Sequence, residues 1–161
     1  MSLRKGIPNL VEAWGKAALQ DAHLELVGMW GLAESRLKAL PANITWRPPC
    51  SPEKLRARYH AADVFVFPSF ADPFGLVLVE AMACGLPAIA SAATAGPDII
   101  NKESGSVIPA GDLDALVESL RWFAAHRDRL PKMGVAARCQ AEIFTWDNYR
   151  NSLTEAVRPY V

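Results

Sequence analysis

Short apolar segments rich in Val, Ile and Phe alternate along this chain with segments of helical periodicity. Extended segments are predicted at residues 23–28, 43–47, 63–67, 87–91 and 105–108. Helices are predicted at about 10–17, 33–40, 51–62, 75–84, 112–123, 127–142 and 146–157. Such alternation favours an α/β fold, in which a Rossmann-like parallel sheet carries helices on both faces.

The bulk properties restrict the class of protein. At 161 residues the chain has the length of one domain, spanning 1–161, with a helical C-terminal part from about residue 112. Its 17 basic and 17 acidic residues cancel, which indicates no nucleic-acid groove and no anionic membrane surface. The three cysteines have no paired spacing, and neither a secretory signal nor a spanning segment is recognised, so a cytoplasmic location is predicted.

The apolar segment 73–97 contains a single charged side chain, Glu80. Because a lone carboxylate is costly to bury, Glu80 is expected to have a dedicated partner. A second acid, Asp72, lies eight residues earlier, in the loop that follows the predicted strand 63–67. Loops at the carboxyl ends of parallel strands are where such folds bind ligands, so this loop is the leading candidate site.

A helix is expected to begin near Gly75, directly after that loop. The backbone amides of Phe74, Gly75 and Leu76 would then lack helical acceptors and would attract a phosphate group. Glu80 lies five residues past Gly75, about 7.5 Å along a helix, which is a suitable distance for a ribose beside that phosphate. With Asp72 on the other side, the arrangement predicts a pocket for a nucleotide sugar.

Residues 72–87, with acids at Asp72 and Glu80, resemble the E-x7-E signature of retaining glycosyltransferases of the GT-B fold, group 1 (family 4). The resemblance covers nearly the whole chain. Further matching segments are 4–6, which fits the family's K-G, together with 61–69, 94–98 and 107–112. The resemblance implies the C-terminal, donor-binding half of a GT-B enzyme, which moves a hexose-like sugar from a nucleoside-diphosphate donor to an acceptor hydroxyl.

The resemblance also implies roles for individual residues. Glu80 would bind the donor ribose and Asp72 would face the donor sugar, and both count as catalytic candidates. The donor-binding set would be Lys5, Arg47, Phe74, Gly75, Leu76 and Glu80, with Lys5 at the diphosphate and Arg47 near the nucleobase. No metal or cofactor is expected, because cationic side chains and helix amides would stabilise the leaving diphosphate.

The chain differs from the family pattern at several points, and each difference leads to a prediction. Asp72 stands where the family usually has Glu, so its reach is one methylene shorter. The strand that precedes the K-G in the family is missing, as is the N-terminal domain that would bind a sugar, lipid or other hydroxyl acceptor. We therefore expect a gapped sheet, or one completed by self-association with a neighbouring chain, and little transfer activity from this chain alone. In the intact enzyme, peripheral contact with the inner membrane face would be compatible with the family.

Two other functions remain as alternatives. A non-catalytic nucleotide-binding or assembly domain is compatible with the neutral composition. A Rossmann oxidoreductase is disfavoured, since no G-x-G-x-x-G follows any predicted strand. Among single residues, Lys5 is expected to be solvated and mobile. Packing in the core or between helices is expected for Trp14, Trp46, Trp122 and Trp146.

Overall fold

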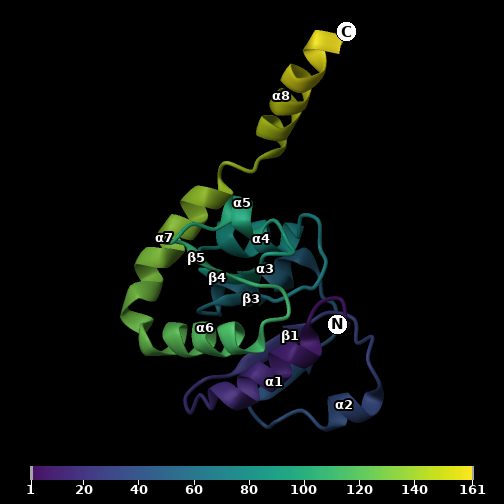
Figure 1. Cartoon of the computed structure of the whole chain (residues 1–161), viewed down its shortest axis with the longest axis vertical. Coiled ribbons are helices and arrows are strands. Elements are labelled where there is room, and N and C mark those ends of the chain that lie inside the picture. Colours follow the sequence, from purple (N-terminus) through teal and green to yellow (C-terminus); the bar gives the residue numbers. More distant parts are fainter. Residues whose placement is uncertain (1, 161) are drawn as a thin grey trace.

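A computed structural model describes residues 2–160 of the chain (Figure 1). Its helices and strands, in chain order, are α1 (Ile7–Ala17), β1 (Leu24–Val27), α2 (Glu34–Lys38), β2 (Ile44–Arg47), α3 (Pro52–His60), β3 (Phe65–Phe67), α4 (Leu76–Ala83), β4 (Ala88–Ser91), α5 (Gly96–Ile99), β5 (Gly105–Ile108), α6 (Leu113–Ala125), η1 (Arg127–Arg129), α7 (Leu130–Ala141), α8 (Trp146–Val157) and η2 (Arg158–Tyr160). Each predicted helix and strand is present. The short α5 was not predicted, because four residues are too few to show helical periodicity.

The strands form two parallel sheets, one with the order β1-β2 and the other with the order β3-β4-β5. Leu24 pairs with Ile44 in the first sheet, and Ala88 pairs with Gly105 in the second. Within residues 2–160 no strand pairing joins the two sheets. The predicted gap is thus confirmed, whereas completion by a neighbouring chain stays a prediction.

Helices cover both faces of the sheets, as the alternation of elements predicted. On one face, Ile89 of β4 shares a core with α1, α6 and the β1-β2 sheet. On the other face, Ala88 and Ala90 pack against α4, α5 and α7. Helix α6 lies beside α1, and α7 lies beside α4 (Figure 1). Because strands of both sheets contribute to the first core, the two sheets belong to one packed unit despite the gap.

Local capping explains where several helices begin. The Ser51 hydroxyl accepts a hydrogen bond from the Lys54 amide at 3.5 Å, and Pro52 occupies the first turn of α3. The Asp112 carboxylate caps α6 through the Ala115 amide at 2.9 Å. These signals were readable in the sequence, which is why the predicted boundaries lie within a few residues of the observed ones.

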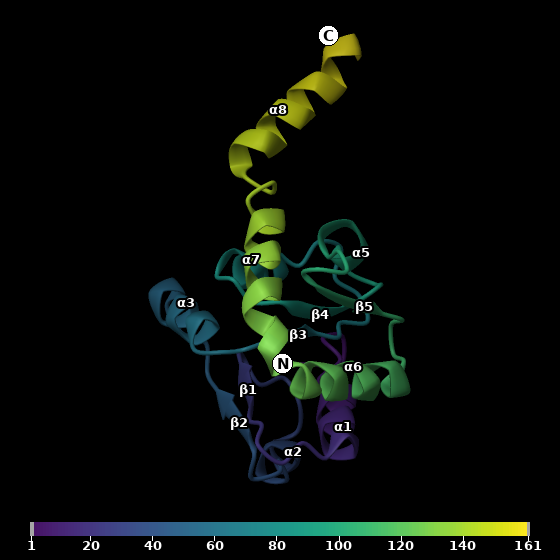
Figure 2. The ribbon, with the colours of Figure 1, turned by 90° about the vertical axis from the view of Figure 1, so that its left-hand side faces the viewer.

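Helix α8 projects away from the two sheets (Figures 1 and 2), and all its side chains from Trp146 to Val157 are exposed. The expectation of packing in the core or between helices is confirmed for Trp14, which is 7% exposed, and for Trp46, which is partly buried against the same core. It is wrong for Trp146, which is 69% exposed, and for Trp122, which lies on an open face of α6. The helical period predicted the helix at 146–157 but could not show whether another element covers it. None of the helices among residues 2–160 is long and apolar enough to cross a membrane.

Candidate functional site

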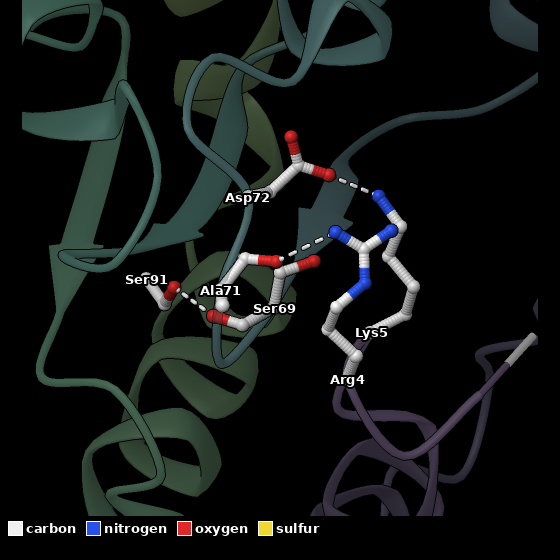
Figure 3. A network of polar contacts seen from close by, with 6 residues as sticks. All are labelled: Arg4, Lys5, Ser69, Ala71, Asp72 and Ser91. Atoms are coloured by element: carbon white, nitrogen blue, oxygen red, sulfur yellow. Dashed lines mark hydrogen bonds and ion pairs between the residues drawn. The ribbon is translucent and has the colours of Figure 1, made fainter.

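The loop after β3 is held in place by the loop after β4. The Ser91 hydroxyl donates a hydrogen bond to the Ser69 carbonyl, and the Asp72 amide donates to the Ala93 carbonyl at 3.1 Å. Ser69 and Ser91 are both buried, so their contact is shielded from water. Figure 3 shows the Ser69–Asp72 loop between Ser91 on one side and the N-terminal segment on the other. The backbone that carries Asp72 is therefore fixed from two directions.

The N-terminal turn, residues 3–6, lies against the same loop. The Phe70 amide donates to the Arg4 carbonyl at 2.8 Å, and the Arg4 guanidinium donates to the Ala71 carbonyl at 3.3 Å (Figure 3). Gly6 has a left-handed φ of 68°, and a Cβ built there would lie 2.1 Å from the Pro68 carbonyl oxygen. Only glycine can make this approach, which places the preceding residue, Lys5, at the carboxyl end of β3.

Lys5 forms an ion pair with Asp72, its Nζ contacting Oδ2 (Figure 3). The Lys5 side chain is 31% exposed and that of Asp72 is 15% exposed. The ammonium also lies 5.0 Å from the centroid of the Phe67 ring, within the range of a cation–π interaction. The expectation that Lys5 would be solvated and mobile is wrong, because the close approach at Gly6 brings it onto the β3 loop.

Helix α4 begins where the sequence predicted, directly after Gly75. Gly75 has a φ of 74°, and a Cβ there would lie 2.5 Å from Cε1 of Phe67. Within the described chain, the amides of Phe74, Gly75 and Leu76 donate no hydrogen bond. They carry the partial positive charge of a helix N-terminus and are available to an anion. The structure thus brings together Lys5, Asp72 and these three amides.

Glu80 lies one turn further along α4 and is exposed. Its carboxylate is not buried, contrary to what the apolar sequence suggested, and within residues 2–160 neither an ion pair nor a hydrogen bond engages it. The reason is the orientation of α4, which buries Leu78, Ala81 and Met82 and leaves the face of Glu80 in water. Burial, and secondarily the Glu80 carboxylate, raises the pKa of the Tyr59 phenol in α3. Glu80 is therefore a solvated group free to accept hydrogen bonds.

Arg47, predicted to lie near the nucleobase, forms an ion pair with Glu25 in this structure. Its Nε donates to Glu25 Oε1 at 3.2 Å, and Arg58 donates to the same oxygen at 2.5 Å. Burial works to raise the pKa of Glu25, but hydrogen bonds from Arg58 and Arg47 outweigh it, and the pKa is lowered. Arg47 therefore links β2 to β1 and α3, and the structure does not bring it to Lys5 or Asp72.

The lowered pKa of Glu25 makes a prediction about acid stability. A carboxyl group whose pKa is lower in the folded state stabilises that state above its unfolded pKa and loses the effect as pH falls through the folded pKa. Glu25→Gln should lower Tm at pH 7 by roughly 1–3 °C. At an acid pH below the lowered pKa of the folded state the difference from wild type should vanish. Thermal unfolding at both pH values checks this, and an equal deficit at both would contradict it; Glu118→Gln, on an exposed face of α6, is the control.

Phe67 is a site residue that sequence reasoning missed. It is 6% exposed, and its ring contacts both the Lys5 ammonium and the position where Gly75 allows α4 to begin. The predicted strand 63–67 includes it, but as one of several apolar residues with no signal that sets it apart. Only the tertiary fold shows that Phe67 supports both halves of the site.

The described residues show no group of three or more His, Cys, Asp or Glu side chains arranged to hold a metal ion. Nζ of Lys5 and the α4 amides supply the positive charge at the site. The arrangement is chemically suited to an anionic group at the start of α4 and to hydroxyl groups beside Asp72 and Glu80.

Comparison with known proteins identifies the class. The model of the family "Glycosyl transferases group 1" matches residues 1–140, and this chain belongs to that family. A curated relative, D-inositol 3-phosphate glycosyltransferase of Rhodococcus jostii (strain RHA1), is 32% identical over 142 residues, which are 88% of this chain and 30% of the relative. The same-named protein of Streptomyces coelicolor is 38% identical over 106 residues, 65% of this chain and 23% of the relative.

Solved structures agree on the fold, which is that of GT-B glycosyltransferases. Sucrose-phosphate synthase from Thermosynechococcus elongatus superposes with a TM-score of 0.83 at 31% identity, over 99% of this chain and 43% of that one. Anabaena HepE, determined in complex with UDP and glucose, has a TM-score of 0.82 at 20% identity, over 99% of this chain and 46% of that one. The chain thus spans less than a third of these curated relatives and less than half of these structures.

Proposed function

We propose that this chain is the donor-binding half of a retaining glycosyltransferase. It would hold a nucleoside-diphosphate sugar with the diphosphate at the start of α4, the ribose at Glu80 and the transferred sugar near Asp72. The observation that carries the proposal is the pairing of Lys5 with Asp72 beside the free amides of α4. Membership of the glycosyltransferase family supports it, as does a fold shared with a protein determined with UDP and glucose.

The proposed chemistry follows from charge development on the donor. As the bond from the sugar to the diphosphate breaks, negative charge grows on the diphosphate, where Lys5 and the amides of Phe74, Gly75 and Leu76 would stabilise it. A donor phosphate oxygen would accept the proton of the incoming hydroxyl on the same face, which retains the anomeric configuration. In this proposal the stabilising charge comes from the protein rather than from a metal.

The acceptor side of the reaction would be supplied by a second domain. The acceptor would be a hydroxyl of a sugar, a lipid or another molecule, and this chain alone would have little transfer activity. We further propose that the intact enzyme works in the cytoplasm, with peripheral contact at the inner membrane face where the acceptor is a lipid. For the gap between the two sheets, we propose that a neighbouring chain supplies a strand between β1 and β3.

Calorimetric titration with UDP, GDP, ADP and NAD tests the donor-binding proposal. We expect one nucleoside diphosphate to bind and NAD not to bind, since no dinucleotide-binding glycine motif follows a strand. Binding of the matching sugar nucleotide should be tighter than binding of the diphosphate alone. If none of the four compounds binds, the proposal is refuted.

Replacing Phe67 should affect both folding and binding. Phe67→Leu removes the ring beneath Lys5, so affinity for the nucleoside diphosphate should fall about threefold, the equivalent of a weak cation–π interaction. Phe123→Leu is the matched control, because Phe123 is 4% exposed but lies in α6, in the opposite core. Tm should fall in both variants, whereas Kd should change only in Phe67→Leu. A loss of affinity in both variants would show that the effect is merely one of stability.

The exposed stripe of α8 favours an assembly role as a second candidate. Its apolar side chains recur at helical spacing and have high exposed fractions; they are Trp146, Tyr149, Leu153 and Val157. An isolated helix of this length is marginal in water, so a covering surface would stabilise it. If the titration shows no nucleotide binding while sedimentation shows association that Leu153→Glu abolishes, the assembly role replaces the donor-binding one.

A further inference from the structure

The ion pair between Lys5 and Asp72 rests on two rigid supports. The backbone of Lys5 is fixed by the hydrogen bond from Phe70 to the adjacent Arg4 carbonyl and by the close approach of Gly6. The backbone of Asp72 is fixed by its own amide bond to Ala93. Surface ion pairs between freely moving side chains are weak, but this pair is partly buried and the backbone of each partner is fixed.

This arrangement gives Lys5 two possible anionic partners. A diphosphate at the free amides of α4 would draw the Lys5 ammonium toward itself, and Asp72 would then lose its counterion. The uncompensated carboxylate would also repel the approaching phosphate oxygens, because both are negative. Asp72 therefore opposes the binding of a bare diphosphate at the same site that Lys5 and the amides favour.

A ligand that carries a sugar changes this balance. Sugar hydroxyls would donate charge-assisted hydrogen bonds to the Asp72 carboxylate and so replace the contact it gives up with Lys5. A nucleoside diphosphate without a sugar has no such donor to offer. Selectivity of this kind, in which one ligand is penalised rather than the other merely favoured, is a recognised route to specificity.

We infer that Asp72 is a specificity-determining residue, which through its competition for Lys5 makes the site prefer a sugar nucleotide over the spent nucleoside diphosphate. This inference rests on the proposed donor-binding function and adds to it a reason for product release. It assigns to Asp72 an unfavourable effect on one ligand, whereas a purely structural ion pair would predict that its loss harms binding of both.

The test uses Asp72→Asn, which keeps the size of the side chain and removes its charge. Kd is measured by calorimetry for inorganic pyrophosphate, for the nucleoside diphosphate that wild type binds, and for the corresponding sugar nucleotide. We expect the variant to bind pyrophosphate and the nucleoside diphosphate about threefold to tenfold more tightly than wild type. The preference for the sugar nucleotide should shrink by at least as much.

Three further variants separate this effect from general changes. Asp72→Glu keeps the charge and should bind pyrophosphate as wild type does. Lys5→Met combined with Asp72→Asn should abolish the gain, because Lys5 is the group released. Asp63→Asn, an exposed residue just before β3, should change no Kd. Thermal unfolding of each variant checks that the fold is retained.

The outcomes are distinct. Tighter pyrophosphate binding by Asp72→Asn, lost again without Lys5, supports the inference. Unchanged or weaker pyrophosphate binding by a folded Asp72→Asn overturns it, while leaving donor binding in place if wild type binds its ligands. Wild type that binds none of the three ligands refutes the proposed function and this inference together.

Discussion

Gly6→Ala should lower the free energy of unfolding by about 3 kcal/mol, the sum of a left-handed backbone at a residue with a Cβ and a clash in a packed region. The clash is severe, since the added Cβ would lie 2.1 Å from the Pro68 carbonyl oxygen and that oxygen belongs to backbone. For a chain of this length the expected fall in Tm is roughly 10 °C. Nucleoside diphosphate binding should also weaken, because Lys5 is carried by the same turn.

Gly15→Ala is the matched control for this prediction. Gly15 lies in α1, eight residues after the start of the helix, and a Cβ there meets no atom within 4 Å. Alanine should therefore stabilise the helix by about 0.5–1 kcal/mol and raise Tm slightly. The two glycine-to-alanine substitutions should change the free energy of unfolding in opposite directions. If thermal and chemical unfolding show this, the close approach at Gly6 is established. If Gly6→Ala unfolds like wild type, the N-terminal turn does not lie against β3 as the structure has it.

Glu80→Ala should produce the largest loss of ligand binding. In the proposed function the Glu80 carboxylate would accept hydrogen bonds from the two ribose hydroxyls. Its removal should then cost about 1.5–3 kcal/mol, a loss of affinity of roughly 10-fold to 100-fold. Folding should be nearly unaffected, because Glu80 is exposed and unpaired among residues 2–160, and alanine is a good helix former. Calorimetry with the nucleoside diphosphate, combined with thermal unfolding, measures both effects.

Glu118→Ala provides the comparison, since Glu118 is an exposed acid in the middle of α6. It should leave both Kd and Tm close to wild type. An affinity for Glu80→Ala within twofold of wild type would contradict the proposal that the ribose binds at Glu80. It would not contradict the proposed diphosphate site at Lys5 and the α4 amides. A large drop in Tm for Glu80→Ala would instead mean that the carboxylate has a structural partner.

Local signals account for what could be predicted. The start of α4 after Gly75, the caps at Ser51 and Asp112, and the alternation of strands and helices are all properties of short segments. The gap between the sheets was also predictable, because it follows from the order of elements rather than from side-chain packing. The acids at the two ends of the E-x7-E-like segment were identified by their isolation in apolar sequence.

The contacts of the charged side chains were harder to predict from the sequence. The sequence suggested that Glu80 is buried and that Lys5 is mobile, whereas the structure leaves Glu80 exposed and pairs Lys5 with Asp72. Burial depends on which face of α4 meets α7, and that is settled by packing between segments about 50 residues apart. The contact between Arg47 and Glu25 likewise depends on the register of β1 against β2, which pairs Glu25 with Thr45, two positions from Arg47.

The amino-acid sequence by itself determined the class of fold, the order of its elements and the helix start that offers free amides to an anion. Those features depend on periodicity, capping and backbone preference, which act over a few residues. The tertiary structure alone decided that Lys5 meets Asp72, that Phe67 lies beneath them and that Glu80 faces water. Such contacts join residues as many as 67 positions apart, and only the packing of helices against the sheets brings them within reach.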